Sequence, residues 1–160
     1  YLGGERPAPR PAADAPLAAA WATTLGRVVA ALDGCLVHEA LAALWDFVGA
    51  ANRFVDAEAP WTLAKAAKAG DDAAAARLRD VLGDLVEACR LVGLAAAPVM
   101  PGAAPRVLAQ LGHAYPWDER GDGGPPLLGE LAWGARAAEP GTLAPPAPLF
   151  PRLGVEAAEG

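Results

Sequence analysis

Residues 36–61 read LVHEALAALWDFVGAANRFVDAEAPW, and they contain the clearest helical pattern in the chain. Apolar side chains recur at alternating spacings of four and three residues, the pattern of an amphipathic helix with one buried face. They are Val37, Leu41, Leu44, Val48, Ala51 and Val55. Proline lacks a backbone donor and disfavours helical geometry in the residue before it. The pattern therefore predicts a helix from about residue 36 to residue 58, ending before Pro60.

Two helices are predicted on either side of this one. Asp14 is a plausible N-cap, and Pro16 in the first turn favours a helix that ends at residues 33–34, Asp-Gly. A second helix is predicted from the acidic pair at residues 71–72 to about Leu91, with Gly93 just after its end. Its polar positions are expected to face solvent: Arg77, Asp80, Asp84 and Glu87. Gly83 inside it predicts either a close approach by another helix or a locally loose helix.

A fourth, short helix is expected over about residues 103–111, stopping at Gly112. The chain has 160 residues, 41 of them alanine, and only 6% are aromatic, a composition that favours helices over strands. The sequence therefore predicts an all-α fold, an antiparallel bundle of about four helices over residues 14–112.

The two ends of the chain are rich in proline and glycine. Residues 1–13 are expected to be a linker or the end of a preceding element. Residues 113–160 are expected to form an extended, loop-rich tail that packs on the bundle and is frayed from about residue 154. Aromatic side chains of this tail are predicted to pin it to the helices; they are Trp117, Trp133 and Phe150. Because the sequence begins with Tyr1, we expect it to be a piece of a longer protein.

Charge and motifs exclude several function classes. The formal net charge is −6, so the chain lacks the broad basic field of a non-specific nucleic-acid or membrane binder. No secretory signal and no apolar run long enough to cross a bilayer is present, so we expect a soluble, cytoplasmic protein with no membrane partner. Cys35 and Cys89 are predicted to be buried free thiols. No known catalytic or metal-binding motif occurs, so we expect neither a catalytic nor a metal site in these residues.

Three stretches, in order, resemble one protein family. Residues 49–61, GAANRFVDAEAPW, followed by TLAKAAK, are similar to a phrase of the anticodon-binding domain of methionyl-tRNA synthetase, a class I aminoacyl-tRNA synthetase. Residues 91–112, LVGLAAAPVMPGAAPRVLAQLG, look like that family's Pro-x-Met-Pro link and the short helix after it. Residues 148–153, PLFPRL, resemble the phrase with which the domain commonly ends.

The resemblance implies an enzyme that ligates methionine to its cognate tRNA, with ATP and magnesium bound in a separate catalytic domain. The motifs of that domain are absent from these residues, so no cofactor is expected here. The implied partners are a methionine-accepting tRNA with a CAU anticodon loop and the enzyme's own catalytic domain. Two alternatives remain open: a related synthetase for isoleucine, leucine or valine, and a helical protein–protein interaction module.

Trp61 is the principal candidate for RNA contact, because unpaired bases are recognised by stacking on aromatic side chains. Pro60 stiffens the backbone before it. The alternative is that Trp61 caps the end of the hydrophobic core. Arg53 and Lys65 flank the motif and are candidates for phosphate contacts, or are merely solvated.

Asn52 and Asp56 complete the candidate site. Asn52 falls among the apolar positions of its helix, so it is either a hydrogen-bonded core residue or an amide at the rim of a site. Asp56, together with Glu58, is expected to repel wrongly docked phosphates. Since no segment is basic, the isolated chain is expected to bind tRNA weakly, with a shallow dependence on salt.

Overall fold

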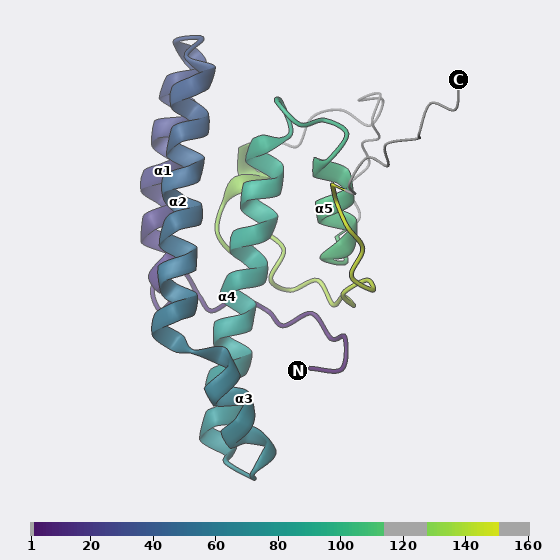
Figure 1. The fold of residues 1–160 in the computed structure, drawn as a ribbon. Helices are drawn as coiled ribbons and strands as arrows, with labels where there is room; N and C mark the ends of the chain where they lie inside the picture. The colour runs from purple at the N-terminus through teal and green to yellow at the C-terminus, as the bar shows by residue number, and fades with distance from the viewer. Residues whose placement is uncertain (1, 114–127, 151–160) are drawn as a thin grey trace, which may run out of the picture.

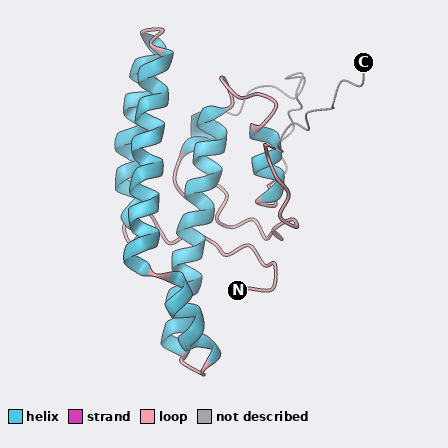
Figure 2. Cartoon of the chain, in the orientation of Figure 1, coloured by secondary structure: helices cyan, strands magenta, loops and turns pink. Residues whose placement is uncertain are grey.

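The computed structural model describes residues 2–113 and 128–150. Figure 1 shows a long hairpin of two helices beside a second group of helices, and Figure 2 shows helices joined by loops. The helices are α1 (Pro16–Asp33), α2 (Val37–Glu58), α3 (Pro60–Lys68), α4 (Asp72–Ala96) and α5 (Ala104–Gln110), with a 3-10 turn, η1 (Leu128–Leu131). The all-α prediction is confirmed. Across the two described ranges, no helix is long and apolar enough to cross a membrane.

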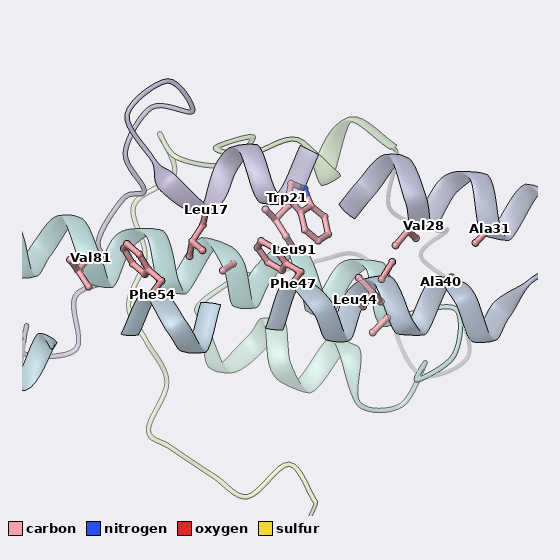
Figure 3. Close-up of a cluster of buried hydrophobic side chains, with 13 residues drawn as sticks. Leu17, Trp21, Val28, Ala31, Ala40, Leu44, Phe47, Phe54, Val81 and Leu91 are labelled. Carbon is pink, nitrogen blue, oxygen red and sulfur yellow. The ribbon is translucent and has the colours of Figure 1, made fainter. Parts of the chain in front are cut away.

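The hydrophobic core lies between α1, α2 and α4. Trp21 of α1 and Phe47 of α2 meet edge to face, with ring centroids 5.0 Å apart (Figure 3). The indole nitrogen of Trp21 donates a hydrogen bond to the carbonyl oxygen of Leu131 at 2.7 Å, so the core also holds η1. Pro16 occupies the first turn of α1 as predicted, but the N-cap is Ala15, and Asp14 makes no capping hydrogen bond.

The corner between α2 and α3 differs from the prediction. Pro60 was expected to end the preceding helix and no helix was predicted before residue 71, yet residues 60–68 form a helix of their own. Pro60 stands at its first position, where the missing N–H costs nothing and the fixed φ suits a helix. One residue, Ala59, makes the turn with φ 44° and ψ 62°, in the left-handed region.

Helix α4 is longer than predicted, and three of its charged residues are buried: Asp84, Glu87 and Arg90. It continues through Gly93 to Ala96, because Val107 and Leu108 of α5 pack against Gly93 and extend the buried surface. Asp84 and Glu87, predicted to face solvent, are 0% and 3% exposed. The predicted start is confirmed, since the Asp71 side chain accepts a hydrogen bond from the Ala74 amide at 2.9 Å.

The N-terminal segment covers the polar side of α4. Arg10 pairs with Asp84, with its Nη2 2.5 Å from a carboxylate oxygen. Gly83 makes the close approach that was predicted for it, but its neighbour is this extended segment and not a helix. A Cβ atom at Gly83 would lie 2.1 Å from the carbonyl oxygen of Ala8.

The C-terminal segment returns over the bundle, as predicted for the residues that are described. The Trp133 indole nitrogen donates to the carbonyl oxygen of Arg10 at 3.0 Å, which confirms this residue as a pin. Phe150 is 71% exposed and does not pin the chain. Trp117 and the fraying expected from residue 154 lie outside the described residues.

Both cysteines are exposed, contrary to the prediction of buried thiols. Cys35 lies in the turn between α1 and α2, with φ 57°. Cys89 borders an apolar groove between α2, α4 and α5, and these apolar surroundings raise the pKa of its thiol.

Candidate nucleic-acid interface

Helix α3 has one face against the bundle and one face open to solvent. Pro60 and Ala64, one turn apart, are buried, and Leu63 packs against the hydrophobic core. Trp61 is 54% exposed, and Lys65 follows it by one turn on the same exposed face. The indole therefore forms an open aromatic surface, and the alternative of a core cap is excluded.

The position of Pro60 explains how this surface is held. Its ring is buried at the corner where α2 ends, and it is the first residue of α3. The Thr62 amide donates to the carbonyl oxygen of Ala59 at 2.8 Å, which closes the first turn around Trp61. A fixed backbone on both sides reduces the ordering entropy that Trp61 loses when a base stacks on it.

Three cations near this corner differ from the other described cations. Arg53, Lys65 and Lys68 are exposed and have no hydrogen bond or ion pair to another described residue. The remaining described arginines bond to carboxylates or backbone carbonyls; they are Arg6, Arg10, Arg27, Arg77, Arg79, Arg90, Arg106 and Arg136. The chain contains no lysine besides Lys65 and Lys68. The uncommitted positive charge of the described residues is therefore concentrated on the end of α2 and on α3.

The other candidate residues lie on the last turns of α2. Asn52 is exposed, which excludes the first of its two alternatives, a core position, and it borders the apolar groove, whose volume is about 420 Å³. Arg53 folds back along α2, since its Nη1 would lie 3.4 Å from a Cβ atom at Gly49. Asp56 is exposed and makes no ion pair with a described residue.

Glu58 does not share the role expected for Asp56. Its carboxylate receives two hydrogen bonds from Arg77 of α4, at 3.0 and 2.5 Å. This pair ties the end of α2 to α4 and neutralises the charge of Glu58. Asp56 therefore supplies an unpaired negative charge on the last turns of α2, as judged from the described residues.

The sequence interpretation missed two exposed residues. Lys68 lies one turn beyond Lys65 in the last turn of α3. Trp45 on α2 is 67% exposed, more than Trp61. Lys68 lies seven residues after Trp61, a spacing that places both on one face of a helix. This spacing would have identified Lys68 only if residues 60–68 had been predicted to be a helix. No group of three or more potential metal-ligating side chains is found within residues 2–113 and 128–150.

Comparisons with known proteins agree with the sequence resemblance. Residues 7–144 match the family model of the anticodon binding domain of methionyl tRNA ligase. A methionine–tRNA ligase of Lactiplantibacillus plantarum is 33% identical over 144 residues, which are 90% of this chain and 20% of the relative. One from Mycobacterium tuberculosis H37Rv is 35% identical over 140 residues, 88% of this chain and 24% of the relative.

Solved structures with a similar fold come from the same family. The apo form of Mycobacterium tuberculosis methionyl-tRNA synthetase superposes with a TM-score of 0.76 and 32% sequence identity, covering 96% of this chain and 29% of that one. The form of the same enzyme bound by methionyl-adenylate gives a TM-score of 0.75. The chain thus spans less than a third of the relatives that it matches. From the family match over residues 7–144 and the shared fold, this chain belongs to the anticodon-binding domain family of methionyl-tRNA ligases.

Proposed function

We propose that this chain binds the anticodon loop of a methionine-accepting tRNA, with the sequence CAU, for a methionine–tRNA ligase in the cytoplasm. The ligase's catalytic domain, with its ATP and magnesium, lies outside this chain and is the second partner. The observation that carries the proposal is the open indole of Trp61 beside the uncommitted cations of α3. Anticodon bases are unpaired, and such bases are bound by stacking on an aromatic ring.

The magnitude of stacking is sufficient for recognition. One base on one aromatic ring contributes about 1–3 kcal/mol by substitution, or roughly a factor of 5 to 150 in affinity. Pro60 and the closed first turn of α3 fix the backbone at Trp61 before the RNA arrives, so less of this energy is lost in ordering.

The charges predict weak binding by the isolated chain. With Arg53, Lys65 and Lys68 as the phosphate contacts, three neutralised phosphates of a single-stranded loop give a slope of about −2 in log affinity against log salt. The net charge of −6 opposes binding further. Nanomolar affinity with a steep salt dependence would contradict this account of the surface.

The test compares two exposed tryptophans. Anisotropy of a labelled anticodon stem-loop is measured with the wild-type chain and with Trp61→Ala, Trp61→Phe and Trp45→Ala, using CAU and scrambled loops. We expect Trp61→Ala to weaken CAU binding about 5- to 150-fold and Trp61→Phe to retain part of it. Trp45→Ala serves as the matched control, since this ring is on α2, and should bind like wild type. Equal binding of both loops would instead favour a protein–protein interaction module.

Asp56 has a separate role in the proposal, which is discrimination. An unpaired carboxylate at the edge of a phosphate-binding surface penalises a loop that brings its backbone too close. Removing the charge by Asp56→Ala should tighten binding of the scrambled loop more than binding of the cognate loop, because only a wrongly docked backbone meets the carboxylate. Unchanged binding of the scrambled loop would show that Asp56 does not act by repulsion.

A further inference from the structure

The exposed face of α3 carries three side chains in line. Trp61, Lys65 and Lys68 are separated by four and three residues, spacings that place them on one face of a helix. Neighbouring members of such a row have Cβ atoms about 5–6 Å apart. Lys68 lies seven residues beyond Trp61, so it is about 10 Å farther along the helix axis.

Lys68 is free to bind an anion. It is exposed and has no bond to another described residue. The acidic residues that follow in the sequence do not form an ion pair with Lys68. The Asp71 carboxylate is engaged with the Ala74 amide at 2.9 Å, and Asp72 is exposed at the start of α4 without an ion pair to a described residue.

A structural role alone accounts for part of this arrangement. Lysines in the last turn of a helix interact favourably with the negative end of its dipole, and both Lys65 and Lys68 are in the last turn of α3. The dipole does not require the two lysines to lie on the same face as Trp61. Nor does it explain why the chain's two lysines stand beside the exposed ring, while all the described arginines except Arg53 are engaged.

We infer that Lys68 is a phosphate-binding residue, and that Lys65 and Lys68 contact successive phosphates of the strand whose base stacks on Trp61. The RNA backbone then runs along α3 from its first turn to its last. A lysine stem is long and flexible enough to meet phosphates at this spacing, and it binds them as a point charge. This inference rests on the proposed function and extends the RNA-binding surface to the end of α3.

The first test is the salt dependence of binding by the full chain. A labelled CAU stem-loop is titrated at several salt concentrations with wild type, Lys68→Gln, Lys68→Arg and Arg27→Gln. Loss of one phosphate contact should reduce the slope by about 0.7 and weaken binding about fivefold at 0.1 M salt. Lys68→Arg should keep the wild-type slope. Arg27→Gln, the charge-matched control, removes an exposed cation on α1 that is paired with Asp46, and should change neither value.

The second test locates the phosphate. Stem-loops that carry one neutral methylphosphonate linkage at each loop position in turn are titrated against wild type and Lys68→Gln. We expect one linkage whose neutralisation weakens wild type about fivefold and leaves Lys68→Gln unaffected. Thermal unfolding of each variant shows separately whether the dipole effect has altered stability.

The outcomes separate the inference from the proposed function. If Trp61→Ala weakens CAU binding but Lys68→Gln keeps the wild-type slope, Lys68 has only a structural role and the inference fails, while the proposed function stands. If neither variant alters binding of the stem-loop, the proposed function itself fails. A lower melting temperature for Lys68→Gln with an unchanged slope also overturns the inference.

Discussion

The guanidinium of Arg90 donates two hydrogen bonds to the carboxylate of Glu87, at 2.7 and 2.6 Å, and both side chains are buried within α4. The pair also holds the C-terminal segment. Arg90 donates to the carbonyl oxygens of Glu130 and Ala132, and the Gly134 amide donates to Glu87 at 2.7 Å. This ion pair therefore helps to attach residues 130–134 to the bundle, together with the hydrogen bond from the Trp21 indole to Leu131.

Removing the charge of Glu87 should be strongly destabilising. Glu87→Gln leaves Arg90 as a buried cation without its counter-ion, which costs about 3–5 kcal/mol when one partner of a buried pair is lost. Urea unfolding measures the loss. The control is Asp46→Asn, which breaks the exposed pair with Arg27 and should cost less than about 1 kcal/mol. Equal costs for the two variants would mean that the Arg90–Glu87 pair is not desolvated.

Gly83→Ala should destabilise the protein although alanine is the better helix former. The propensity gain is about 1 kcal/mol. A Cβ atom 2.1 Å from the Ala8 carbonyl oxygen displaces the N-terminal segment, so we expect a net loss of about 1–3 kcal/mol. Gly26→Ala in α1 is the matched control: nothing lies within 4 Å of its Cβ position, and it should stabilise by about 0.5–1 kcal/mol. Chemical denaturation of both variants shows whether each substitution raises or lowers the free energy of unfolding.

Sequence periodicity was sufficient for α2 and insufficient for α4. Helix α2 has a wide apolar stripe with polar residues opposite, and its predicted and observed limits agree closely. In α4, Asp84 and Glu87 resemble residues of a solvated face, because most carboxylates on helices are solvated. Glu87 has a local partner in Arg90, three residues on, but the burial of both carboxylates also depends on partners distant in sequence: Arg10 lies 74 residues from Asp84, and the Gly134 amide lies 47 residues from Glu87. No local pattern contains that information.

The candidate site could be predicted only in part, because it too depends on contacts between residues distant in sequence. The motif around Pro60 and Trp61 was found from its resemblance to a family, whereas residue pattern alone left the exposure of Trp61 undecided. Lys68 was missed because a lysine becomes informative only when its ion pairs are known. Finding it required the three-dimensional positions of the carboxylates that the structure describes.

Ala59 should tolerate glycine better than any β-branched residue. Its φ of 44° is in the left-handed region, which costs an L-residue about 1–2 kcal/mol. We expect Ala59→Gly to leave stability unchanged or raise it by up to about 1 kcal/mol, and Ala59→Val to lower it by more than about 1 kcal/mol. Ala57→Gly, in the helical part of α2, should instead lower stability by about 1 kcal/mol. Thermal unfolding of the three variants tests this, and a loss with Ala59→Gly equal to that with Ala57→Gly would contradict it.

His113 should make the protein less stable as the pH falls from 6.5 towards 4. Burial, with Arg6, Arg90 and Arg136 nearby, lowers the pKa of its imidazole from 6.5 to about 4, although Glu130 opposes this. Below pH 6.5 the unfolded chain takes up a proton that the folded chain does not, so stability declines across this window by at most about 3 kcal/mol. Urea unfolding between pH 7 and 4.5 measures how the free energy of unfolding changes with pH. Carboxylates contribute at lower pH; one of them is Glu5, whose pKa is lowered by Arg79. His113→Gln should flatten the curve, and His38→Gln, at an exposed position, should not; a slope that survives in His113→Gln would assign the effect to another group.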